Sequence, residues 1–338
     1  SGIQLRSGGH NTVVNCDSHE NFDYQNNGGN ADGFADKQGD ACPGNVYIGC
    51  RAWGNSDDGW DSFQRETDGT PTVYINCITY NNGPATFDMS AHPRVLGVDA
   101  GLFADKSLSS IENGGNPNGF KLGGKGTVHN TELYRCLAIG HRSKGFDQNN
   151  NAGAMKIVNC TAYANNINYG FGNDYTYTLD IHNCISLDAK DSDIKTHKSG
   201  TVTQSHNTWL SGFSTSDADF ESLDVDGLLL SPRNADGSLP ETLLLHLKSG
   251  ATNLIDKGMV YDKSKFEGDV IANYVDYKGS APDLGCYETD GSASAIIGIT
   301  DDVRPINPNL PCYDLNGRRV EAGYRGVVIQ NGRKFLAK

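Results

Sequence analysis

Short runs of alternating apolar and polar residues, bounded by glycine or asparagine, recur through the first two hundred or so positions of the chain. Typical runs are Asn45-Val46-Tyr47-Ile48 and Met155-Lys156-Ile157-Val158. A period of two residues predicts β-strands, and these positions lack the 3.6-residue apolar stripe of a helical repeat. The pattern therefore predicts an all-β protein built from many short strands.

Two sequence columns repeat along these runs with one shared period. The first is a cysteine that follows Asn, Gly or Arg, and the second is a glycine followed by an aromatic residue. The cysteines are Cys16, Cys50, Cys77, Cys136, Cys160 and Cys184, and the glycines are Gly33, Gly59, Gly119, Gly145 and Gly170. Both columns keep a period of about 25 residues, and one longer step indicates an insertion of about 32 residues near 81–117.

This period in an all-β sequence predicts a right-handed parallel β-helix. Each coil would contribute short strands, and inward side chains would stack between coils about 4.8 Å apart. The cysteine and aromatic columns then become interior ladders, with the cysteines acting as small unpaired hydrophobes. Nine cysteines is an odd number, so they cannot all pair within the chain. Asparagines suit the left-handed turns between strands.

The periodicity fades after about residue 205, which predicts three segments. We expect a parallel β-helix core over 1–210, the last coils and a closing segment over 211–290, and a small β module over 291–338. Pro240 to Leu245 predicts the start of a short helix, and Asn-Gly pairs at 316–317 and 331–332 predict turns in the last module. Because no amphipathic cap precedes the first coil, we also expect further coils upstream of Ser1.

Composition and charge exclude several classes of protein. The apolar content of 37% argues against disorder, and the longest apolar runs are far too short to span a membrane. A net charge of −13 with no sustained basic run argues against a nucleic-acid partner. The same charge also opposes direct attraction of a polyanion.

Acidic residues gather on neighbouring coils when the glycine–aromatic column is aligned. Asp61 and Lys121 become outward neighbours, and Asp32 and Asp58 precede the glycines of successive coils. Four carboxylates, including Asp57, could hold Ca²⁺, which accepts six to eight oxygen ligands in irregular geometry. A lysine beside a metal could act as a base because the cation lowers its pKa. A solvated acidic turn and an ordinary surface Lys–Asp ladder are the alternatives.

Four ordered motifs at these positions carry a family resemblance. They are Asn30-Ala31-Asp32-Gly33-Phe34-Ala35, Asn55-Ser56-Asp57-Asp58-Gly59-Trp60-Asp61, Asn118-Gly119-Phe120-Lys121-Leu122-Gly123-Gly124 and Arg142-Ser143-Lys144-Gly145-Phe146-Asp147-Gln148-Asn149. Over residues 1–200 the chain resembles family-nine polysaccharide lyases, which are pectate lyases with a parallel β-helix fold. The resemblance implies Ca²⁺ held by Asp32, Asp57, Asp58 and Asp61, with Lys121 as the general base. We expect Arg142, Lys144, Asn118 and Asp147 to bind substrate, with simple surface charge as the alternative for Arg142 and Lys144. We expect His141 to be a structural residue or a contact at the rim of the site, and not the base.

The resemblance implies that the protein cleaves galacturonate-containing pectin by Ca²⁺-dependent β-elimination, with Lys121 as the base. Alternatives are a rhamnogalacturonan I lyase of the same mechanism, a β-helix glycoside hydrolase using Asp57 and Asp58, and a non-catalytic glycan-binding solenoid. The Gly-His-Gly motif of polygalacturonase-type hydrolases does not occur. The tail from Cys312 to Lys338 resembles sorting modules of secreted Bacteroidetes proteins. We therefore expect a secreted or cell-surface monomer whose partner is an acidic polysaccharide.

Overall fold

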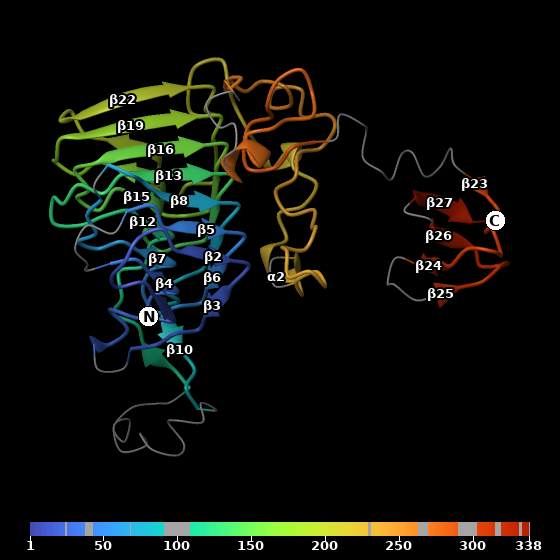
Figure 1. The fold of residues 1–338 in the computed structure, drawn as a ribbon, viewed down its shortest axis with the longest axis horizontal. Helices are drawn as coiled ribbons and strands as arrows, with labels where there is room; N and C mark the ends of the chain where they lie inside the picture. Colours follow the sequence, from blue (N-terminus) through green and yellow to red (C-terminus); the bar gives the residue numbers. More distant parts are fainter. Residues whose placement is uncertain are drawn as a thin grey trace.

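The repeat of about 25 residues forms one coil of three short strands, and successive coils stack (Figure 1). The computed structural model describes residues 1–23, 26–37, 43–67, 69–90, 109–228, 231–262, 270–289, 303–314, 319–330 and 333–337. Equivalent strands of neighbouring coils pair in parallel and build three sheets. The parallel β-helix predicted from the period is therefore present.

The three sheets follow the coil order. The first contains β1 (Ile3–Gln4), β4 (Phe34–Ala35), β7 (Trp60–Asp61), β12 (Phe120–Lys121), β15 (Lys144–Asp147), β18 (Ile167–Phe171) and β21 (Ser192–Thr196). The second contains β2 (Thr12–Val14), β5 (Val46–Ile48), β8 (Thr72–Ile75), β13 (Thr131–Tyr134), β16 (Ala154–Val158), β19 (Tyr177–His182) and β22 (Gly200–Ser205). The third contains β3 (Asp17–His19), β6 (Arg51–Trp53), β9 (Ile78–Tyr80), β14 (Leu137–Ile139), β17 (Thr161–Tyr163) and β20 (Ile185–Leu187).

The long step between Gly59 and Gly119 is a single coil with an insertion, as predicted. Strand β7 pairs directly with β12, which places Trp60 opposite Phe120 and Asp61 opposite Lys121. Within the insertion, β10 (Thr86–Phe87) and β11 (Ile111–Glu112) form an antiparallel pair. The alignment that made Asp61 and Lys121 neighbours is therefore correct.

The turn from the second sheet to the third explains the residue before each cysteine. Asn15, Gly49, Asn76, Arg135, Asn159 and Asn183 all have φ between 50° and 60°. Glycine and asparagine tolerate this left-handed conformation, whereas most other residues pay strain there. Arg135 is the exception, and its guanidinium binds Glu288 and the backbone carbonyl of Asp276 in the closing segment.

Stacked side chains fill the interior of the coils. Phe34, Trp60, Phe120, Phe146 and Tyr169 stack with ring centroids 4.6 to 5.2 Å apart. The cysteine column lies beside them, and the eight cysteines in the described segments are free. The predicted unpaired interior ladder is confirmed for its six members, whereas Cys42 lies outside the described segments.

A ladder of asparagine side chains crosses the corner between the third sheet and the first. Asn21 donates to Asn55 at 2.7 Å, and Asn55 donates to Asn82 at 2.8 Å. His141 takes the next place, where its Nδ1 accepts the backbone N–H of Asn82, and Asn165 follows. The imidazole of His141 is buried, as expected for a structural residue. We call this set the asparagine ladder.

The last position of the glycine–aromatic column was predicted incorrectly. Tyr169, not Phe171, stacks on Phe146, and Gly170 lies opposite Asp147. Both Tyr169 and Phe171 are buried because alternation points both side chains inward. The motif Gly170-Phe171 therefore lies two residues later in its coil than the pairs before it.

The segment after the last coil is mostly irregular and packs against the second and third sheets. The helical turns in its described residues are η3 (Asp217–Asp219), α2 (Val225–Leu228) and η5 (Val270–Asn273). Residues 240–245 form no helix, which contradicts the prediction from Pro240. Leu244 and Leu245 instead belong to a buried apolar cluster that includes Leu137, Ile139 and Ile185 of the third sheet.

The C-terminal residues form a separate small sheet ordered β23 (Val303–Arg304), β27 (Arg333–Ala337), β26 (Gly326–Gln330), β24 (Cys312–Asp314) and β25 (Arg319–Val320). Its core contains Ile306, Cys312, Val328 and Ala337. The predicted Asn-Gly turns fall at 316–317 and 331–332, outside the described residues. Among the described helices, none combines the length and apolar character needed to cross a bilayer.

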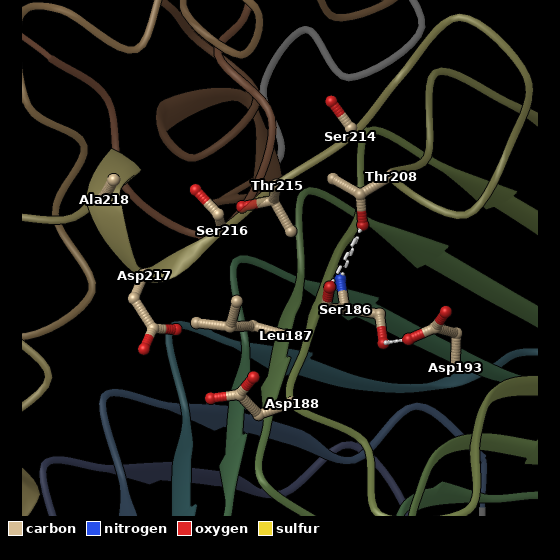
Figure 2. A pocket seen from close by; sticks show the side chains of 10 residues that line it. All are labelled: Ser186, Leu187, Asp188, Asp193, Thr208, Ser214, Thr215, Ser216, Asp217 and Ala218. Carbon is tan, nitrogen blue, oxygen red and sulfur yellow. Dashed lines mark hydrogen bonds between the residues drawn. The ribbon is translucent and has the colours of Figure 1, made fainter.

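A cavity of about 550 Å³ lies where β20 meets residues 214–218 (Figure 2). Some of its polar groups bind one another. Ser186 donates its backbone N–H to Thr208 at 2.9 Å and its hydroxyl to Asp193 at 2.6 Å. None of the residues lining this cavity belongs to the site predicted from the sequence.

Candidate active site

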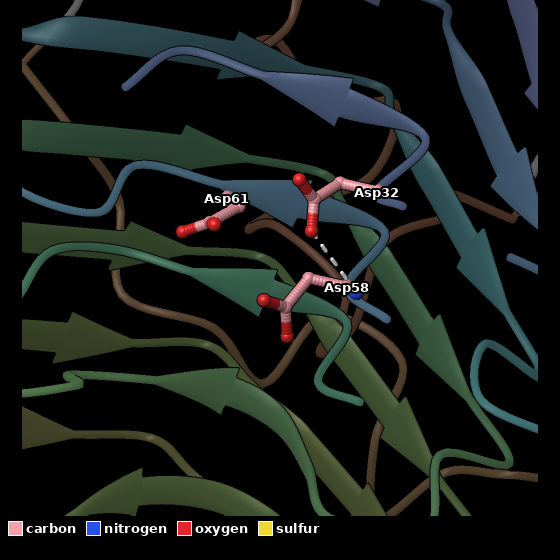
Figure 3. A group of neighbouring side chains, drawn as sticks. All are labelled: Asp32, Asp58 and Asp61. Atoms are coloured by element: carbon pink, nitrogen blue, oxygen red, sulfur yellow. Dashed lines mark hydrogen bonds between the residues drawn. The ribbon is translucent and has the colours of Figure 1, made fainter. Parts of the chain in front are cut away.

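Three aspartates from two successive coils converge on the outer side of the first sheet (Figure 3). Asp32 and Asp58 each precede the glycine that opens a strand, and Asp61 ends β7. One carboxylate oxygen from each lies within 4.8 Å of the others. The three side chains are at most 3% exposed. We call Asp32, Asp58 and Asp61 the aspartate cluster.

Glycine at the start of each strand permits this convergence by leaving room for a neighbouring coil. A Cβ added to Gly59 would lie 2.1 Å from the Thr79 hydroxyl and 2.7 Å from the Gly119 carbonyl oxygen. Real Cβ atoms do not approach other atoms so closely, so any side chain there would push the coils apart. The glycine column therefore reflects close backbone approach between coils.

Asp57 lies next to the aspartate cluster but outside that three-residue group. Its Oδ1 accepts the backbone N–H of Asn116, which belongs to the segment returning from the insertion. Burial and the neighbouring charge of Asp32 raise the pKa of Asp57 to about 6. The structure thus brings together three of the four predicted metal ligands and gives the fourth a contact with the insertion.

Lys121 extends from β12 to the aspartate cluster. Its Nζ lies 2.9 Å from Asp58 Oδ2 and 3.3 Å from Asp61 Oδ1, and the side chain is 16% exposed. The Phe63 ring packs on its other side, with the centroid 5.5 Å from Nζ. Burial lowers the pKa of Lys121, but the carboxylates of Asp58 and Asp61 outweigh it and raise the pKa above its usual value. In this arrangement Lys121 is a protonated ammonium.

Lys37 is a site residue that the sequence reasoning missed. Its Nζ lies 2.8 Å from Asp32 Oδ2 and 2.7 Å from Asp61 Oδ2, and the residue is 8% exposed. A signal was available, because position 37 lies two residues beyond Ala35, which aligns with Asp61 in the outward column. Strand alternation keeps residues two apart on the same face.

The predicted substrate-binding residues have different surroundings. Asn118 is buried and donates its backbone N–H and side-chain amide to Asp58 Oδ1, at 2.8 and 2.9 Å. Asn118 therefore orients a carboxylate of the aspartate cluster, and its burial does not support the predicted contact with substrate. Lys144 pairs with the buried Asp147 at 2.7 Å. Arg142 is exposed and donates to the backbone carbonyl of Gly115 in the insertion.

The donor set of the aspartate cluster suits a hard divalent cation. It offers carboxylate oxygens only, and the group contains neither a cysteine nor a histidine. Ca²⁺ prefers such ligands, whereas zinc sites use sulfur and imidazole nitrogen. The residues present therefore fit Ca²⁺.

Comparison with known proteins identifies the family. Residues 1–207 match the family model described as the Pel9A-like, right-handed β-helix region. The chain belongs to this Pel9A-like family. Membership confirms both the resemblance drawn from the four motifs and the right-handed parallel β-helix predicted from the period.

Several relatives of this Pel9A-like chain are pectate lyases. Pectate lyase L of Dickeya dadantii (strain 3937) is 38% identical over 295 residues, which cover 85% of this chain and 58% of the relative. Pectate lyase PEL9 of Emericella nidulans is 29% identical, covering 72% of this chain and 58% of the relative. This chain thus spans somewhat over half the length of these relatives.

Two solved structures resemble the fold. The crystal structure of pectate lyase Pel9A has a TM-score of 0.66 and 37% identity, and the match covers 84% of this chain and 61% of that one. A rhamnogalacturonan lyase has a TM-score of 0.56 and 26% identity, and the match covers 74% and 60% of the two chains.

Proposed function

We propose that this protein is a pectate lyase that cleaves galacturonate-containing polysaccharide by β-elimination, with Lys121 as the base. The observation that carries the proposal is the placement of a partly exposed lysine amine against three buried carboxylates on one face of the coil. Pectate lyases among the relatives support the same reaction.

The elimination needs a group that removes the proton at C5 of a uronate, which lies α to its carboxylate. Neutral Lys121 Nζ would take that proton, a double bond would form between C4 and C5, and the C4–O bond would break. The departing glycosidic oxygen would then take a proton from solvent. The products are a new chain end and an unsaturated sugar.

Asp32, Asp58 and Asp61, with Asp57 beside them, are the residues that would hold Ca²⁺. When bound, Ca²⁺ would supply positive charge for the substrate carboxylate, where elimination builds negative charge. The charges of Asp58 and Asp61 raise the pKa of Lys121, so its role as base requires those charges to be engaged elsewhere. Asn118 keeps Asp58 in place through two hydrogen bonds.

A rhamnogalacturonan lyase is the second candidate, because a protein of that name is among the structural relatives. Rhamnogalacturonan I presents the same acidic sugar. The hydrolase alternative is less well supported, since Asp58 is fully buried and bound by Asn118 and Lys121. Such a carboxyl group is poorly placed to exchange protons with a sugar oxygen.

The test offers polygalacturonate and rhamnogalacturonan I to one protein preparation, with Ca²⁺ and with excess chelator. Elimination produces unsaturated ends that absorb ultraviolet light, and hydrolysis produces reducing ends without that absorbance. We expect unsaturated product from polygalacturonate in Ca²⁺ and none in chelator. Reducing ends without the absorbance would refute the elimination reaction. Full activity in chelator would show that the reaction does not need the metal.

We further propose that the protein acts outside the cell, because its polymeric substrate cannot cross a membrane. We also propose that it acts as a monomer. Fractionation of the producing cells tests the location. Sedimentation of the purified protein tests the oligomeric state.

A further inference from the structure

Lys37 contacts two carboxylates of the aspartate cluster, Asp32 and Asp61, which come from successive coils. Asp32 precedes β4 and Asp61 ends β7, and the Nζ of Lys37 bridges one Oδ2 atom of each. The ion pairs are nearly dry, with the lysine side chain 10% exposed and both carboxylates 3% or less. The two contacts, at 2.8 and 2.7 Å, are those of a charged ammonium between two carboxylates.

The two lysines divide the aspartate cluster between them. Lys121 binds Asp58 Oδ2 and the Oδ1 of Asp61, whereas Lys37 binds Asp32 and the other oxygen of Asp61. Three converging carboxylates would otherwise repel one another across a few ångströms of low-dielectric protein. Lys37 therefore stabilises the convergence of residues from two coils.

The same contacts place Lys37 in competition with a metal. The oxygens that Lys37 occupies belong to two of the carboxylates that would bind Ca²⁺, and an ammonium and a divalent cation repel each other at such short range. A divalent cation that bound between these carboxylates would therefore push the ammonium of Lys37 away from the oxygens that it bridges.

We propose that Lys37 is a built-in counter-ion of the aspartate cluster, which holds Asp32 and Asp61 together and which a divalent cation must displace. The proposal rests on the metal site of the proposed function. Removing the ammonium should strengthen Ca²⁺ binding and weaken the fold when chelator is present. Lys37 would thus be a positioning residue that sets the metal affinity.

The test measures Ca²⁺ affinity by calorimetry, and thermal midpoints in chelator and in saturating Ca²⁺, for the wild type and Lys37→Met. We expect at least tenfold tighter binding in Lys37→Met, a lower midpoint in chelator and a larger rise on adding Ca²⁺. Lys195→Met is the matched control, because Lys195 lies on β21 of the same sheet and pairs with Asp191. Its affinity should equal that of the wild type.

A measurement on the wild type keeps the proposal testable if Lys37→Met does not fold. Acetylation of lysines, followed by mass spectrometry, should find Lys37 protected in chelator and reactive in Ca²⁺, with Lys195 reactive in both. Protection that persists in saturating Ca²⁺ overturns the proposal, as does unchanged or weaker Ca²⁺ binding by folded Lys37→Met. Both results leave the proposed function intact. Failure of both proteins to bind Ca²⁺ would instead refute the metal site, and this proposal with it.

Discussion

Acid should weaken the fold through His141, the one imidazole in the asparagine ladder. Its Nδ1 accepts the backbone N–H of Asn82 at 3.3 Å, so the neutral ring carries its proton on Nε2, which faces Thr79 Oγ1 at 3.3 Å. Protonating Nδ1 would set two donors against each other in a buried site. Burial lowers the pKa of His141 to about 3 from an ordinary value near 6.5.

The sign and size of the effect follow from this difference. Between pH 6.5 and about 3 the unfolded chain holds a proton on this residue and the folded chain does not. The free energy of unfolding therefore falls by about 1.4 kcal/mol per pH unit across that window, to a limit of about 5 kcal/mol. Above pH 7 the effect disappears.

Replacing His141 by asparagine isolates this contribution. Asn82 and Asn165 already occupy neighbouring places in the ladder, so His141→Asn keeps the ladder's amide chemistry and removes the titrating group. In urea unfolding from pH 7 to pH 4, the free energy of unfolding should fall less for the variant than for the wild type as the pH is lowered. Thr79→Val, which keeps the imidazole, is the control and should retain the wild-type slope. Parallel pH profiles for wild type and His141→Asn would refute the reasoning.

Three further predictions concern the site and the core. Asn118→Ala should lower the free energy of unfolding in urea by about 3 kcal/mol. Asp58 loses a charge-assisted hydrogen bond, and the backbone N–H of Lys144 loses its acceptor. An unchanged free energy of unfolding would contradict this. Gly59→Ala should lower the free energy of unfolding by about 1–3 kcal/mol, because the new Cβ meets the Thr79 hydroxyl. Adding Thr79→Ala to this variant should restore part of the loss, and no restoration would argue against the clash. Reductant should leave the thermal midpoint unchanged, because the described cysteines are free; a clear drop would indicate disulfides.

The coil alignment could be predicted because two independent columns share one period. Once Trp60 and Phe120 occupy the same ladder, strand alternation requires Asp61 and Lys121 to be neighbours on the outer face. The same logic could have found Lys37, two residues beyond Ala35 on the same face. The spacing of the motifs therefore predicts most of the site, because residues one coil apart in the sequence of a parallel β-helix lie next to each other in space.

Other features depend on contacts that no period reports. The shift from Phe171 to Tyr169, at the fifth position of the aromatic column, arises because both side chains point inward, and only packing against Phe146 decides between them. The path of the closing segment depends on Leu244 and Leu245 meeting the third sheet. The burial of Asn118 follows from its hydrogen bonds to Asp58, which lies 60 positions away in the sequence.

The rate at which Lys121→Ala forms unsaturated product from polygalacturonate in saturating Ca²⁺ tests the central claim most directly. A positioned base contributes about 10²- to 10⁴-fold to the rate, so the account predicts a loss of that size, with Ca²⁺ binding and urea unfolding close to wild type. Lys195→Ala, from the same sheet, should keep full activity. A folded Lys121→Ala protein that retains activity within a few-fold of the wild type would contradict the assignment of Lys121 as the base.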